Sequence, residues 1–80
     1  MNIYLLEQGV NQNYDTYDSC VVVAESEEEA RQCHPRGDKY NLSRKDWASD
    51  PSQVEVTLLG ICTDKSYNSG AVLCSSFNAG

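Results

Sequence analysis

Residues 19–37 read SCVVVAESEEEARQCHPRG, and this stretch decides the fold class. Its first part, SCVVVA, is a continuous run rich in β-branched residues, which is typical of a strand covered on both faces. Ser26 is a good helix N-cap, and Glu29 three residues later completes a capping box. Pro35 and Gly37 are expected to end that helix after about two turns. The stretch therefore predicts a buried strand followed by one short helix.

Three further segments of the chain have strand character. They are NIYLLEQ at 2–8, VEVTLLGIC at 54–62 and AVLCSSF at 71–77. Apolar and polar residues alternate at the start of the second segment, which is typical of a strand with one covered face. The polar stretch TDKSYNSG at 63–70 resembles the loop of a β-hairpin. We therefore predict a single α+β domain over residues 1–80: a mostly antiparallel four-stranded sheet of order ββαββ along the chain, with one short helix on one face.

The size and charge of the chain limit its functions. It has 80 residues, with 12 acidic against 6 basic side chains and a formal net charge of −6. A chain of this length forms one core, and its acidity disfavours general binding of DNA or RNA. The start, MNIYLLEQ, lacks the basic and long apolar segments of a secretion signal or a membrane anchor. We therefore expect a protein of the cytoplasm, without membrane contact, whose four cysteines are free thiols.

A domain this small has marginal stability, and one short helix covers only part of a four-stranded sheet. The remaining apolar surface must be covered by the polar segment 38–53 or by another subunit. Both considerations predict a homo-oligomer.

The sequence offers little for metal binding or catalysis. The cysteines at 20, 33, 62 and 74 lack the paired spacing of a zinc site, and His34 is the only histidine. Cys33 and His34 are adjacent, and adjacent helical residues point about 100° apart, which disfavours a shared proton. We therefore expect no metal, no cofactor and no catalytic residues, with a small hydrolase as the least favoured alternative.

The segment YDTYDS at 14–19 is the best candidate for a ligand site. One of its tyrosines could close the edge of the core while its aspartates and serine bond the backbone of a turn. Alternatively, the rings could stack on a planar group while the carboxylates accept hydrogen bonds from it. Arg36 beside His34 adds positive charge for a phosphate. The candidate ligand-binding residues are Tyr14, Asp15, Tyr17, Asp18, Ser19, His34, Arg36 and Asn78.

The motifs YDTYDS, CVVVA, ESEEEAR and HP, with the terminal SFNAG, resemble those of small accessory proteins encoded by bacteriophages and prophages. The resemblance implies a protein that counters host defence in the host cytoplasm. The favoured hypothesis is non-enzymatic sequestration of a small nucleotide-type ligand. The alternative is an acidic interaction protein that occludes a basic site on a host defence protein, in the manner of a nucleic-acid mimic.

Overall fold

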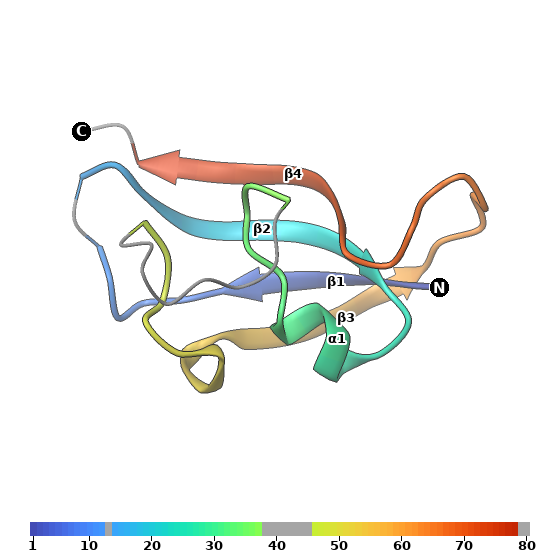
Figure 1. Cartoon of the computed structure of the whole chain (residues 1–80), viewed down its shortest axis with the longest axis horizontal. Coiled ribbons are helices and arrows are strands. Elements are labelled where there is room, and N and C mark those ends of the chain that lie inside the picture. The colour runs from blue at the N-terminus through green and yellow to red at the C-terminus, as the bar shows by residue number, and fades with distance from the viewer. Residues whose placement is uncertain (13, 38–45, 79–80) are drawn as a thin grey trace.

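A computed structural model of the chain describes residues 1–12, 14–37 and 46–78. It contains a four-stranded antiparallel sheet and one short α-helix, which confirms the predicted α+β fold (Figure 1). The elements in chain order are β1 (Asn2–Glu7), β2 (Thr16–Ala24), α1 (Glu27–Arg31), a 3-10 helix (Pro51–Gln53), β3 (Glu55–Ile61) and β4 (Ala71–Asn78).

The spatial order of the strands is β3-β1-β2-β4, so the two apolar strands β1 and β2 occupy the centre. The prediction of a hairpin at 63–70 was wrong, because β3 and β4 form opposite edges of the sheet. β1 pairs with β2 on one side and with β3 on the other, and β4 therefore pairs with the open side of β2. The connection between β3 and β4 passes the N-terminal end of β1, where the Cys62 N–H donates to the Met1 carbonyl at 2.8 Å (Figure 1).

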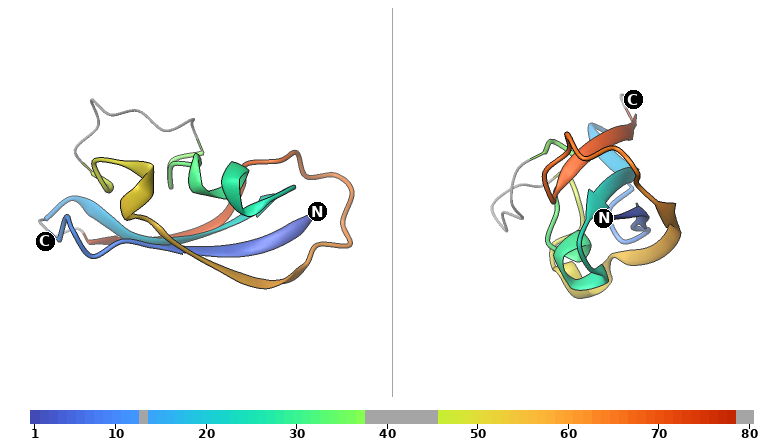
Figure 2. Two further views of the ribbon diagram at one scale, coloured as in Figure 1. Left: turned by 90° about the horizontal axis from the view of Figure 1, so that it is seen from below. Right: turned by 90° about the vertical axis from the view of Figure 1, so that its right-hand side faces the viewer.

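The helix and the segment after the undescribed residues cover the same face of the sheet (Figure 2). Trp47, Ala48 and Val54 from that segment are buried together with Ala30 of α1. The described half of the predicted covering loop, 46–53, therefore performs the expected role, whereas 38–45 lies outside the described residues. The members of this core from the sheet are Tyr4, Leu6, Cys20, Val22 and Ala24.

The helix is shorter than predicted. Its N-cap is Ser26, whose hydroxyl accepts from the Glu29 N–H at 3.2 Å, as expected. The Glu29 carboxylate does not complete the capping box but accepts from the Ser69 hydroxyl at 3.3 Å. The helix ends with Gln32 as its C-cap, before Pro35 could interrupt it. Within the described residues, no helix has the length and hydropathy that a membrane crossing requires.

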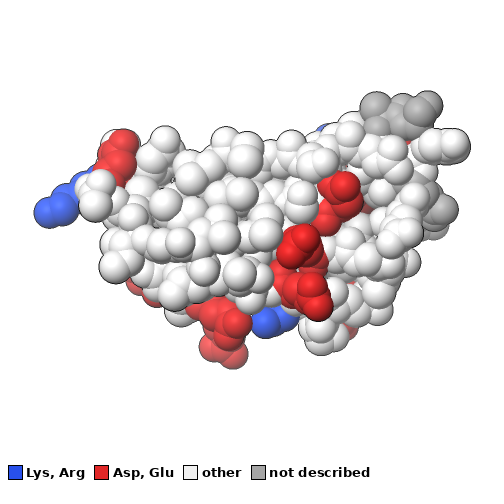
Figure 3. Space-filling view, turned by 180° about the vertical axis from the view of Figure 1, so that it is seen from behind, with Lys and Arg blue, Asp and Glu red and all other residues white. Residues whose placement is uncertain are grey.

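The opposite face of the sheet has no covering element among the described residues (Figure 2). Ile3, Leu5 and Val21 lie half-buried on it, and the registers place Leu5 opposite both Val21 and Thr57. Most of this face carries no charged side chain, and a group of carboxylates lies right of the centre of the view, with others at its lower edge and upper left (Figure 3). Glu7 of β1 and Glu55 of β3 are exposed and directly opposite each other in the sheet.

Candidate functional site

The segment after α1 is fixed by a buried histidine. The His34 side chain is almost completely buried, and its Nε2 lies 2.9 Å from Asp46 Oδ1. The backbone N–H of Arg36 donates to His34 Nδ1 at 3.1 Å. Because Nδ1 accepts this hydrogen bond, the ring proton sits on Nε2 and is donated to Asp46. His34 is therefore an anchor for the chain in this structure.

Asp46 is held by two donors. In addition to His34, the Arg36 Nε–H donates to Asp46 Oδ2 at 2.7 Å. Partial burial raises the pKa of the Asp46 carboxyl, but the hydrogen bonds from Arg36 and His34 and the positive charge of Arg36 lower it by more. The pKa therefore lies below its usual range, and Asp46 stays ionised. The Arg36 guanidinium is fixed by this contact while about half of its side chain remains exposed.

An aromatic cluster lies beside this network, at the start of β2 and the end of β4. The rings of Tyr17 and Phe77 pack with their centroids 4.7 Å apart and tilted by 59°. The guanidinium carbon of Arg36 lies over the Tyr17 ring at 5.9 Å, which is within cation–π range. The His34 ring meets Tyr17 edge-on at 6.1 Å. Tyr17, Arg36 and Phe77 therefore form one surface, which we call the aromatic–arginine site.

Of the predicted ligand residues, Tyr17, His34 and Arg36 lie close together. Asn78 directly follows Phe77 in the sequence. The Asn78 carbonyl accepts from the Asp15 N–H at 2.6 Å, so the C-terminal end of β4 lies against the first loop. Asp15 has a φ of 62° and shapes the turn before β2. These contacts define the border of the aromatic–arginine site.

The structure separates the other predicted residues from this site. Tyr14 is 75% exposed and makes no ring contact among the described residues. Asp18 falls at a register irregularity between Tyr17 and Ser19 and is exposed. Ser19 pairs with Glu7 on the uncovered face of the sheet. Simple alternation through YDTYDS fails here, because the bulge at Asp18 changes the side on which the preceding residues lie.

Sequence reasoning missed Phe77 and Asp46. Phe77 is the only phenylalanine of the chain, and it lies next to the predicted ligand residue Asn78 in the terminal SFNAG motif. Asp46 lies 12 residues after His34, a separation at which no local pattern reveals a contact. The carboxylate partner of a lone histidine could therefore be found only from the fold.

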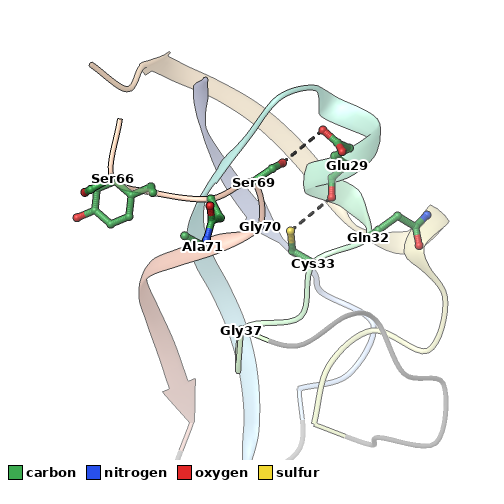
Figure 4. A pocket seen from close by; sticks show the side chains of 10 residues that line it. Glu29, Gln32, Cys33, Gly37, Ser66, Ser69, Gly70 and Ala71 are labelled. Carbon is green, nitrogen blue, oxygen red and sulfur yellow. Dashed lines mark hydrogen bonds between the residues drawn. The ribbon is translucent and has the colours of Figure 1, made fainter. Parts of the chain in front are cut away.

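A pocket lies between α1 and the connection that leads into β4 (Figure 4). Its volume is about 800 Å³, and none of the predicted ligand residues lines it. The lining residues are Glu29, Gln32, Cys33, Gly37 and the segment 66–71. The Cys33 Sγ–H donates to the Glu29 carbonyl at 3.4 Å, and both burial and the Glu29 charge raise the pKa of this thiol. We call this cavity the α1 pocket.

No described part of the chain gathers three or more His, Cys, Asp or Glu side chains in a way that could hold a metal ion. All four cysteines are free thiols, as predicted, with Cys20 and Cys33 buried. Comparison of the chain with family models, with curated proteins and with solved structures gave no match.

Proposed function

We propose that the protein binds and sequesters a small nucleotide-type ligand at the aromatic–arginine site, without changing it chemically. The observation that carries this proposal is the surface formed by Tyr17, Phe77 and Arg36. Aromatic rings bind a planar base by stacking, and a guanidinium binds phosphate oxygens in a geometry that suits its planar fork. In this proposal the protein is a phage-type accessory protein that removes a nucleotide signal of host defence in the host cytoplasm.

The three residues of the aromatic–arginine site have different roles in this proposal. Tyr17 is half-buried and packs against the core, so it supports the site rather than offering a free face. Phe77 is 42% exposed, so its ring is accessible to a base. Arg36 is held by Asp46 with about half of its side chain in solvent, which lets a phosphate reach it without reorganising a flexible side chain.

A binding function also agrees with the state of the only histidine. The His34 ring is buried and hydrogen-bonded at both nitrogens, to Asp46 and to the Arg36 backbone. General acid–base catalysis needs a group within reach of the substrate proton. The favoured proposal therefore assigns His34 to the framework of the site.

Calorimetric titration against cyclic dinucleotides, cyclic trinucleotides and ADP-ribose derivatives tests the proposal. Loss of one stacking contact is worth about 1–3 kcal/mol, so Phe77→Ala should weaken binding roughly ten- to a hundredfold. Tyr67→Ala is the matched control, because Tyr67 is similarly exposed at 39% but lies in the α1 pocket. Arg36→Gln should weaken binding as well, whereas Lys65→Gln removes the same charge from the exposed 62–70 connection and should not. No binding of any member of the panel would overturn the proposal.

The second candidate is an acidic interaction protein. Glu25, Glu27, Glu28 and Glu29 are all exposed around the start of α1 and could meet a basic site on a host defence protein. Such a complex should dissociate at about 0.5 M salt, where charges are screened beyond a few ångströms. A purified complex with one stoichiometric protein partner, lost when Glu27 and Glu28 are both replaced by Lys, supports this candidate. A co-purifying small molecule with the ultraviolet absorption of a nucleobase supports sequestration instead.

Self-association is part of the proposal. The uncovered face of the sheet presents the half-buried side chains of Ile3, Leu5 and Val21. The chain extends 35 × 22 Å in its two longest directions. A face of these dimensions is close in area to the roughly 800 Å² that each partner contributes to a standard interface. We expect sedimentation analysis at tens of micromolar to show an oligomer.

A charge on this face should weaken the oligomer. Thr57 is exposed opposite Leu5, so Thr57→Glu places a carboxylate inside the interface. Ser52→Glu adds the same charge on the 3-10 helix, outside that face, and should leave the oligomer intact. A monomeric wild-type protein, or equal behaviour of the two variants, would contradict this role of the face.

A further inference from the structure

We propose that the α1 pocket is a second binding site, which takes a small ligand carrying a positively charged amine or guanidinium group. The pocket is lined by none of the residues that form the aromatic–arginine site, and it has the opposite charge preference, so it does not depend on the function proposed above. Figure 4 shows Glu29 and Gln32 on the helix side of the pocket and Ser66 on the facing wall.

The wall of the pocket that faces the helix is tied to the strand–helix junction. The Ser69 hydroxyl accepts from the Glu25 N–H at 3.2 Å and donates to Glu29 Oε2 at 3.3 Å. The Gly70 N–H donates to the Val23 carbonyl at 2.7 Å. These contacts fix the distance between α1 and the connection that lines the pocket. A ligand therefore meets a preformed site, and it does not have to order this wall on binding.

The charge of the lining selects the ligand. Among the described residues that line the pocket, Glu29 is the only one with a formal charge, because the raised pKa of Cys33 keeps its thiol neutral and the others are uncharged. The lining therefore attracts a cation and repels a phosphate, and the net charge of −6 adds to this preference. Nucleotides are thus excluded from this pocket by the same electrostatics that favour an amine.

The remaining lining groups suit a small organic cation. Tyr67 supplies an aromatic ring, and a cation over such a ring is stabilised by its quadrupole. Gln32 and Asn68 offer amide oxygens, and Ser66 offers a hydroxyl, all of which accept hydrogen bonds from N–H donors. The volume of about 800 Å³ lies within the range of ligand sites, roughly 300–1,000 Å³, and exceeds what a metal ion or a single ammonium ion requires. An elongated amine or a guanidinium compound matches both the charge and the size.

Titration of the full chain with agmatine, which carries one amine and one guanidinium group, tests this proposal at low salt. We expect saturable binding that Glu29→Gln weakens about tenfold, the loss of one well-placed ion pair. This substitution keeps an oxygen that can accept from Ser69, so the wall should remain in place. Tyr67→Ala should weaken binding about two- to fivefold, in keeping with an exposed cation–π contact.

Glu28→Gln is the matched control, because it removes the same charge from the adjacent exposed residue, which does not line the pocket. We expect it to change the affinity for agmatine less than twofold. Equal losses for Glu28→Gln and Glu29→Gln, or no saturable binding at millimolar agmatine, would overturn the proposal.

Two further comparisons complete the test. Phe77→Ala should leave agmatine binding unchanged, so failure of the nucleotide site and failure of the α1 pocket are distinguishable. A short arginine-containing peptide distinguishes the two sources of the ligand group: tighter, Glu29-dependent binding of the peptide identifies a partner's side chain as the ligand, and tighter binding of agmatine identifies a free amine. Both results support the pocket as a cation site.

Discussion

Replacement of Tyr17 by alanine separates the two interpretations of YDTYDS, because the structure gives its two tyrosines different environments. The Tyr17 ring packs against the core and meets Phe77, His34 and Arg36 at centroid distances of 4.7, 6.1 and 5.9 Å. Tyr14 is 75% exposed. Replacement by alanine should therefore lower the stability strongly at Tyr17 and hardly at all at Tyr14.

The size of the effect follows from the buried area. Full burial of an aromatic side chain covers about 150–250 Å², so the half-buried Tyr17 covers about 75–125 Å². At about 25 cal/mol per Å², removal of the ring costs about 2–3 kcal/mol. A globular domain has a free energy of unfolding of only about 5–15 kcal/mol, so Tyr17→Ala should remove a large part of it. Tyr14→Ala should change it by less than about 0.5 kcal/mol.

Urea denaturation followed by tryptophan fluorescence measures this difference. Trp47 is the only tryptophan and is 2% exposed, so its emission reports the loss of the core. With a urea dependence of about 1 kcal/mol per M for a small domain, the midpoint for Tyr17→Ala should fall by roughly 2–3 M, or the variant should be unfolded without urea. Tyr17→Phe, which keeps the ring, should stay close to the wild type. Equal midpoints for Tyr17→Ala and Tyr14→Ala would refute the assignment of Tyr17 to the core edge.

Three further predictions concern pH, thiols and the backbone. Because the pKa of Asp46 is lowered in the folded state, its ionised form contributes stability above about pH 4, and this stability is lost as the pH falls through the folded-state pKa. In Asp46→Asn, the melting temperature should therefore fall less steeply on acidification than in the wild type. Exposed Cys74 should react rapidly with a thiol reagent at pH 8. Cys20 should react only on unfolding, because it is buried and because burial and the neighbouring thiols raise its pKa to about 12. Equal reaction rates of the two thiols in mass-spectrometric mapping would contradict this prediction. Gly70→Ala should lower the free energy of unfolding by about 1–2 kcal/mol because its φ is +97°, whereas Gly60→Ala, with open space around it and no positive φ, should lower it by less in the same urea assay.

The local elements of the fold were predictable because their signals lie within a few residues. The hydroxyl of Ser26 and the N–H of Glu29 are three residues apart, and the predicted cap forms as expected. Val54 and Val56 alternate with exposed Glu55 in the predicted strand, and they face the core. Burial and capping of this kind depend only on period and spacing, which the sequence displays directly.

The order of the strands was not predictable in the same way. The polar connection 62–70 has hairpin composition, yet it joins two strands on opposite edges. Which strand pairs with which depends on the relative free energies of alternative sheets, and no local composition contains that comparison. No local sequence signal predicts the bulge at Asp18 either. The bulge places Tyr17 on the covered side of the sheet, while Ser19 lies on the uncovered side. For the candidate site, this one irregular residue decides which ring supports the surface.

The segment 33–37 links the two candidate sites. Cys33 and Gly37 line the α1 pocket, while His34 and Arg36 between them turn to Asp46 and the Tyr17 ring. The anchoring of His34 therefore holds a wall of each site at once.

A chain with a net charge of −6 can present a cation to an anionic ligand because one carboxylate, that of Asp46, fixes Arg36 at the aromatic surface. The carboxylates Glu25, Glu27, Glu28 and Glu29 gather instead around the start of α1. Since salt screens interactions beyond about 8 Å at physiological ionic strength, the charges nearest to each site matter more than the net charge. In the two proposals, the same acidic chain therefore offers Arg36 to a phosphate at one surface and Glu29 to an amine at the other.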